Sequence, residues 1–289
     1  MLTLPEHPSD QPGRPDRPTL SEALSRGIED DDPALLALLM AAEFYPALDV
    51  SSYMQRVDAL AARVQEHLGR ARTPARVVSA LNKVLFDEEG FAGNVDDYYD
   101  PRNSFLNEVL DRRTGIPISL SALYLAVARR IRQPFAGVGL PLHFVVRYTG
   151  PRAEIYVDAF QQGEVLSRED CLSRVESTIG PATAAEQDSF LATVTSRAML
   201  FRMLANVKLV YVKRHEFALA ARTVNLMLQV RPDDADEVRD LGLLHYQMEE
   251  WGRAAQLLQR YMEENPDASD ADSVRERLRQ AGNRRARLN

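Results

Sequence analysis

The spacing of hydrophobic residues changes once along the first half of the chain. Between residues 50 and 131, apolar positions recur in four segments at the interval of about 3.6 residues that is typical of amphipathic helices. From residue 135 to residue 167 they form short β-branched and aromatic runs separated by glycine and proline, which predicts an antiparallel sheet. Helices followed by strands predict an α+β domain over residues 20–184.

The second half is helical and contains an internal repeat. Pro232 and Pro266 are 34 residues apart, and the same offset pairs Phe217 with Trp251. A period of 34 residues, with two helices and a closing proline, is typical of tetratricopeptide repeats. We therefore expect an all-α, tetratricopeptide-like region over residues 185–270. Because two copies are fewer than such repeats need to fold alone, this region should pack on the first domain.

Composition and charge exclude several classes of protein. The net charge of −7 argues against a dedicated nucleic-acid binder, apart from weak phosphate contact by a basic C-terminal tail at residues 271–289. No apolar run is long enough to cross a membrane. Residues 1–19 are rich in proline and predict a disordered tail without the features of a signal peptide. Cys171 is the only cysteine, which excludes a disulfide framework and makes a cytoplasmic location the expectation.

One histidine and one aspartate have the spacing of a catalytic pair. His143 begins the run HFVVRY, and Asp158 follows fifteen residues later, on the next expected strand. A papain-like or transglutaminase-like site places a histidine base beside an orienting acid, facing a nucleophile at the start of a helix. The helix that should carry this nucleophile, residues 119–131, precedes both residues in the chain.

Longer stretches of the sequence resemble a known family. NSFLNEVLDRRTGIPISLSALYLAVARR, GVGLPLHFVVRY and YVDAF, with the paired helices that follow, are similar to the SirB-type family. That family comprises bacterial proteins with a transglutaminase-like domain followed by tetratricopeptide repeats. The resemblance covers roughly residues 30–268 and implies a papain-like α+β core with an all-α C-terminal region.

The sequence departs from active transglutaminase-like enzymes at the nucleophile. Alignment of the helix places Pro117 where those enzymes have cysteine, and Cys171 comes too late in the chain to replace it. We therefore expect a non-catalytic pseudoenzyme that binds a protein or peptide and needs no metal or cofactor. The alternative is a hydrolase or acyl transferase in which His143 is the base, Asp158 orients it, and Ser119 or water is the nucleophile.

The repeats offer a second candidate surface. Stacked helix pairs leave a concave face lined by the first helix of each pair, which suits an extended peptide. If the repeats instead only brace the first domain, this face has no ligand. The residues expected on it are Arg202, Asn206, Lys213, Arg239 and Tyr246. Tyr98 and Tyr99, in a polar loop before the catalytic-like helix, are candidates for a lid over the His143 cleft.

Overall fold

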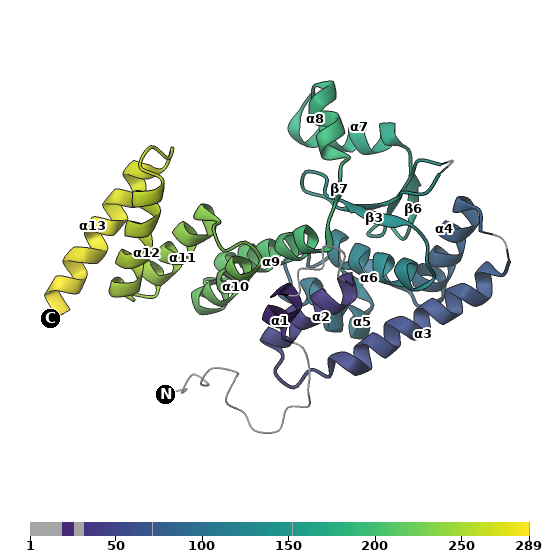
Figure 1. Ribbon diagram of the computed structural model, residues 1–289, viewed down its shortest axis with the longest axis horizontal. Helices are drawn as coiled ribbons and strands as arrows, with labels where there is room; N and C mark the ends of the chain where they lie inside the picture. The colour runs from purple at the N-terminus through teal and green to yellow at the C-terminus, as the bar shows by residue number, and fades with distance from the viewer. Residues whose placement is uncertain (1–18, 26–31, 71, 152, 289) are drawn as a thin grey trace.

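A mixed α/β part and an elongated helical arm make up the computed structural model, which describes residues 19–25, 32–70, 72–151 and 153–288 (Figure 1). The expected α+β domain and the all-α region that follows it are both confirmed. The expected N-terminal tail, apart from Thr19, lies outside the described residues.

Helices of the first part pack under one face of a small sheet. Asp32 begins one of them: its carboxylate accepts a hydrogen bond from the backbone of Ala34, and Pro33 occupies the first turn. Lys83–Glu88 is a π-helix, labelled η2, that continues directly from α4. The other elements are α1 (Leu20–Ser25), α2 (Pro33–Phe44), α3 (Val50–Leu68), α4 (Pro74–Asn82), the 3₁₀ helix η3 (Pro101–Ser104), α5 (Leu106–Arg112), α6 (Pro117–Arg130), and the parallel pair β1 (Ala92–Gly93) and β2 (Thr114–Gly115).

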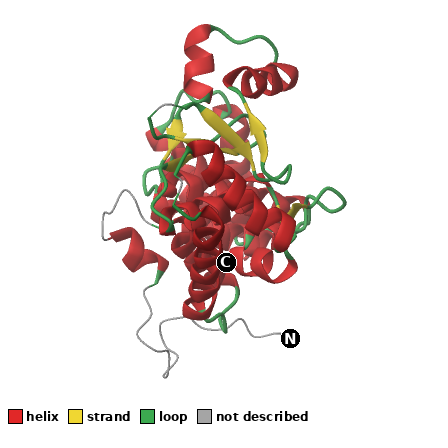
Figure 2. Ribbon diagram, turned by 90° about the vertical axis from the view of Figure 1, so that its right-hand side faces the viewer, coloured by secondary structure: helices red, strands yellow, loops and turns green. Residues whose placement is uncertain are grey.

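The main sheet has five antiparallel strands in the order β6-β5-β4-β3-β7. Its strands are β3 (Phe135–Val138), β4 (Val145–Tyr148), β5 (Ile155–Asp158), β6 (Glu164–Leu166) and β7 (Thr193–Val194). The first four were expected, whereas Thr193–Val194 lies in a segment expected to be a helix. On the face away from α6, the sheet is covered by α7 (Arg168–Ile179) and α8 (Ala184–Phe190) (Figure 2).

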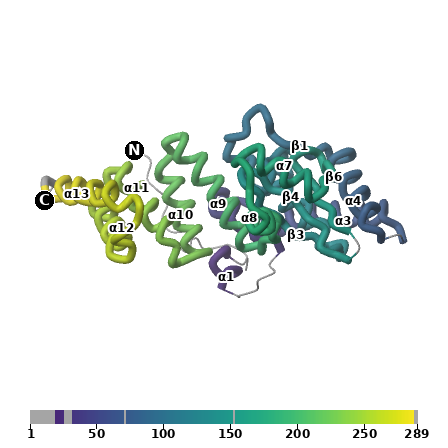
Figure 3. Tube along the Cα trace, turned by 90° about the horizontal axis from the view of Figure 1, so that it is seen from above, coloured from purple at the N-terminus to yellow at the C-terminus, as the bar shows by residue number. Residues whose placement is uncertain are grey.

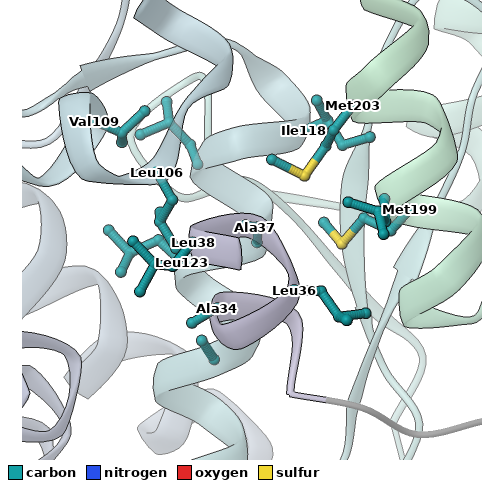
Figure 4. Packing of buried hydrophobic residues seen from close by; sticks show 14 of the residues in the cluster. Ala34, Leu36, Ala37, Leu38, Leu106, Val109, Ile118, Leu123, Met199 and Met203 are labelled. Atoms are coloured by element: carbon teal, nitrogen blue, oxygen red, sulfur yellow. The ribbon is translucent and has the colours of Figure 1, made fainter. Parts of the chain in front are cut away.

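Two buried clusters hold these layers together. The larger one joins α2, α5 and α6 to the first helix of the arm, where Met199 and Met203 pack near Leu36 and Ile118 (Figure 4). The smaller one lies between the sheet and α7 and includes Cys171. Because the larger cluster spans both parts of the chain, the arm is anchored on the first domain, as the short repeat array predicts.

The arm is a row of paired helices that extends to the C-terminus (Figure 3). Its helices are α9 (Ser196–Lys213), α10 (Phe217–Val230), α11 (Ala235–Gln247), α12 (Trp251–Glu264) and α13 (Ala271–Leu288). Gly242 permits the close approach of α11 and α12, because a Cβ atom there would lie 2.8 Å from the side chain of Leu258. The residues expected to form a basic tail are helical instead: α13 packs on α12 through Val274.

Tyr124 lies in the middle of α6, within the larger buried cluster. Its side chain is fully buried, and its hydroxyl has no hydrogen-bond partner among the described residues. Replacing it with phenylalanine should raise the free energy of unfolding by about 1 kcal/mol, because an unsatisfied polar group is removed from the core. Urea unfolding measures the change. In the matched variant Tyr156→Phe, the lost hydroxyl donates to Glu154 (2.8 Å), so this variant should be destabilised instead.

Candidate functional site

His143 and Asp158 meet at one end of neighbouring strands. Nε2 of His143 lies 2.8 Å from Oδ2 of Asp158. Strand alternation places both side chains on the face covered by α7, because His143 is two residues before Val145 and Asp158 two residues after Tyr156, and both of these pack in the α7 cluster. The predicted pair therefore forms, and the fifteen-residue spacing comes from one strand, a turn and the next strand.

The carboxylate of Asp158 is fully buried and has several partners. Oδ1 accepts from the backbone N–H of Phe160 (3.0 Å) and that of Gln161 (3.3 Å). Oδ2 accepts from His143 and also from the guanidinium of Arg174, on α7. Burial on its own would raise the pKa of Asp158, but the hydrogen bond and charge of His143, together with those of Arg174, hold this pKa below its usual value.

These contacts fix how His143 can act. An ionised carboxylate only accepts hydrogen bonds, so a neutral His143 carries its proton on Nε2 and has a lone pair on Nδ1. No residue in the described ranges forms a hydrogen bond to Nδ1. The side chain of His143 is 23% exposed, so Nδ1 is the nitrogen that remains to accept a proton or a ligand donor.

The start of α6 has neither a thiol nor an exposed hydroxyl at Pro117 and Ser119. Pro117 occupies the first turn of the helix. Ser119 is fully buried, and its hydroxyl lies 2.6 Å from the carbonyl of Asn103, to which it donates. The same oxygen accepts from the backbone N–H of Ile116 (3.0 Å). These hydrogen bonds tie η3 to the helix start and leave the hydroxyl no exposed surface.

A row of aromatic rings leads from His143 towards the helical arm. The ring centroid of Phe160 lies 6.2 Å from that of His143 and 6.1 Å from that of Tyr98. Tyr99 follows at 5.4 Å from Tyr98, and Nζ of Lys213, on α9, lies 3.7 Å from the centre of the Tyr99 ring. Both tyrosines are partly exposed. Tyr98 and Tyr99, the residues expected to form a lid, thus belong to a row of aromatic contacts between the first domain and the arm.

The turn that precedes His143 is strained and exposed at its tip. The backbone N–H of His143 donates to the carbonyl of Leu140 (3.2 Å), with Pro141 and Leu142 between them. Leu142 has a φ of 55°, a conformation that favours glycine, and 81% of its surface is exposed. Arg202 reaches from α9 to donate to the carbonyls of Leu140 and His143, the latter at 2.7 Å. An arm residue therefore holds the turn in place.

The residues predicted on the concave face fall into three groups. Arg202 donates to the carbonyl of His143, and Lys213 lies over the ring of Tyr99. Arg239 is paired with Asp236, Asp240 and Asp270. Tyr246 donates to Gln280 on α13 (2.7 Å), and Asn206 is partly buried on α9. Most of the expected peptide-binding groups thus have partners within the chain.

Three residues of the site were not anticipated. Arg174 lies on the helix after the β5–β6 hairpin, and no local pattern in the sequence indicates that it contacts Asp158. Phe160 is part of the strand run YVDAF, and nothing in that run predicts its contact with His143. Leu142 did give a signal: the order Pro141-Leu142 before a strand has proline where a type II turn favours it, with leucine where such a turn usually has glycine.

Other chemistry is limited in the part of the chain that the structure describes. Burial raises the pKa of the Cys171 thiol to about 12, so at neutral pH it is a packed apolar side chain rather than a thiolate. Within the described ranges, no three side chains are grouped to hold a metal ion. Nor does any helix in those ranges have the length and apolar character needed to cross a membrane.

Comparison with known proteins agrees with this arrangement. Residues 51–205 match the transglutaminase-like superfamily, and residues 207–279 match the tetratricopeptide repeat. A UPF0162 protein of Xylella fastidiosa is 33% identical over 264 residues, which cover 89% of this chain and 93% of that protein. A UPF0162 protein of Vibrio cholerae is 32% identical over 59% of this chain and 63% of its own. Human F-box only protein 21 is 33% identical over 61% of this chain but only 29% of its own.

A transglutaminase-like domain, with a histidine–aspartate pair at the strand ends and tetratricopeptide helices after it, defines the class of this protein. Within that class, the chain belongs to the UPF0162 family, the SirB-like proteins that its sequence motifs resemble. Tetratricopeptide repeats generally mediate protein–protein interactions, which agrees at this coarse level with the expected binding function.

Proposed function

We propose that this protein is a non-catalytic interaction module, and that it binds a partner protein or peptide at the face formed by Leu142, Tyr98, Tyr99 and Lys213. We call this the Leu142 face. It adjoins His143 and includes residues from both the first domain and α9, so a bound partner would contact both parts of the chain.

The conformation and exposure of Leu142 carry this proposal. A non-glycine residue at positive φ costs of order 1–3 kcal/mol, and strain of this kind is concentrated at functional sites. Burial of the Leu142 side chain would offset part of that free-energy cost, yet the side chain is 81% exposed. The neighbouring tyrosines add large, rigid surfaces with a polar end, a combination enriched at protein interfaces.

The neighbourhood of His143 supports a role without covalent catalysis. Asp158 is shared between His143 and Arg174, so its negative charge is already compensated by a permanent cation. Ser119 is buried and bonded to the backbone, and Pro117 has no nucleophile. On this view the histidine–aspartate pair shapes the turn that displays Leu142, and Nδ1 of His143 accepts a donor from the partner.

One observation favours the alternative, a hydrolase. The free Nδ1 of His143 could take a proton from water, which would then be the nucleophile while Asp158 orients the ring. Amide and ester hydrolysis by purified protein, compared with His143→Ala and Ser119→Ala, separates the two functions. We expect no turnover in any form. Turnover lost only in His143→Ala would establish the water mechanism, and turnover lost in both would establish a serine nucleophile.

Selection of peptides tests the binding function directly. Peptides from a random displayed library are selected on the full chain, and their affinities are measured for the wild type, Leu142→Ser and Tyr99→Ser. We expect each substitution to weaken binding about tenfold or more, as loss of an apolar anchor at an interface does. Ile179→Ser is the matched control, since Ile179 is 53% exposed on α7, outside this face. Selected peptides that bind all variants equally would contradict the proposal.

A further inference from the structure

A cavity of about 530 Å³ lies away from the Leu142 face, between α4, η2 and the β5–β6 edge of the sheet. The larger side chains of its apolar wall are Val78, Ile155 and Val165. Val165 pairs with Val157, which packs in the helix-side core, so its side chain is on that same face of the sheet. At this edge the helices do not cover it, and Val165 is 57% exposed. The volume is within the range of small-molecule sites, about 300–1,000 Å³.

The rim of the cavity is mainly positive. Nε of Arg76 donates to the carbonyl of Leu68 (3.2 Å), which orients the guanidinium, and no carboxylate in the described ranges pairs with it. Lys83 adds a second permanent cation, 3.6 Å from Asp87, the one carboxylate in the lining. His67 also lines the cavity but is bound to Glu88 (2.9 Å). The cations therefore exceed the acids, and the least compensated one is Arg76.

The local backbone keeps these charges at the opening. Lys83 and Asp87 belong to the π-helix η2, and such helices are rare and frequently occur at functional sites. Asn82, the residue before it, donates to the carbonyl of Gly163 (2.7 Å) and so joins this wall to the β5–β6 hairpin. The turn of that hairpin begins at Asp158. The cavity is thus built from elements that are fixed relative to the His143 region.

We propose that this cavity binds a small carboxylate carried on an aliphatic chain, of which octanoate is the simplest probe. The chain packs against Val78, Ile155 and Val165, and the carboxylate pairs with Arg76 and Lys83. Charge and shape both select this ligand: the wall is apolar, whereas the opening carries Lys83 beside Asp87 and, in addition, Arg76, which has no carboxylate partner among the described residues. The site is separate from the Leu142 face, and neither proposal depends on the other.

Isothermal titration calorimetry of the full chain with octanoate tests the site. We expect saturable binding, with weaker binding of octanol and none of octylammonium, because only the carboxylate matches the rim. The variants Arg76→Gln and Lys83→Gln remove exposed charges and should each weaken octanoate about tenfold, the effect expected for one charge-assisted hydrogen bond. Val165→Asp should abolish binding, since it places a carboxylate in the apolar wall.

Two controls separate this site from nonspecific uptake. Arg72→Gln removes a cation from the α3–α4 loop that does not line the cavity, and it should leave the affinity unchanged. Leu142→Ser should also leave it unchanged, because the Leu142 face is elsewhere. Equal binding of octanol and octanoate, an unchanged affinity in both Arg76→Gln and Lys83→Gln, loss of binding in Leu142→Ser, or no saturable binding at all would each overturn the proposal.

Discussion

Replacing Arg174 with glutamine should lower the free energy of unfolding by about 3 kcal/mol at pH 8, because a buried carboxylate then loses its permanent cation. Asp158 has no exposed side-chain surface, and among the described residues His143 would be the one side chain still bonded to it. Glutamine keeps the aliphatic stem but is too short to put a donor where Nη1 of Arg174 lies, so the variant removes both the charge and the hydrogen bond to Asp158. Urea unfolding followed by circular dichroism measures the change.

The same variant should depend on pH in a defined direction. The pKa of Asp158 is lowered in the folded protein, so its stabilising contribution is present above the unfolded value of about 3.9 and is lost as the pH falls through the folded value. Arg174 is one of the groups that lower this pKa, so its loss destabilises the protein only while Asp158 is ionised. The destabilisation should therefore be full at pH 8 and become smaller as the pH falls below about 3.9, where Asp158 becomes protonated.

Glu164 provides the matched control. It is the other partner of Arg174, at 2.5 Å, but it is 49% exposed. Glu164→Gln removes an ion pair that water can replace, and it should change the unfolding free energy by no more than about 1 kcal/mol. If Arg174→Gln is as mild as Glu164→Gln and independent of pH, then Arg174 is not what compensates Asp158. In that case the carboxylate of Asp158 no longer supports a non-catalytic role for His143.

Local patterns in the sequence were sufficient for the first four strands of the main sheet, for the helical repeat and for one pair of the site. Alternation along the strands and a fifteen-residue spacing bring His143 to Asp158, and both are properties of short segments. The 34-residue period likewise places the starts of α10 and α12, at Phe217 and Trp251. In each case the interaction is decided by neighbours in the chain or by a regular repeat.

The elements and contacts that the sequence did not predict depend on interactions between distant segments. Thr193–Val194 has no strand pattern of its own and becomes β7 because β3 offers it an open edge. The arginine-rich segment after residue 270 becomes a helix because Val274 and Ala281 can be buried against the repeat. The contact between Arg174 and Asp158 is decided in the same way, since α7 must fold back over the sheet before Arg174 can reach the carboxylate.

The contacts of Arg202 also join segments that are distant in the sequence. The repeat pattern placed it on a peptide-binding face, whereas in the structure it donates to the carbonyls of Leu140 and His143 and stacks on Phe144, 5.5 Å from the ring centre. Arg202→Met keeps most of the apolar stem but removes the donors from two partly buried carbonyls. We expect the unfolding free energy to fall by about 2–3 kcal/mol.

A local readout distinguishes this positioning role from a general loss of stability. The amide of His143 is bonded across the turn to Leu140, so its hydrogen exchange should speed up in Arg202→Met well beyond that of amides in β5, by about tenfold. Lys213→Met is the control from the same helix: it removes an exposed cation from Tyr99 and should leave the turn protected. Unchanged exchange at His143 in Arg202→Met would mean that the turn keeps its shape without the arm. In that case the strain at Leu142 is maintained within the first domain alone, and the helical repeats do not determine how the Leu142 face is presented.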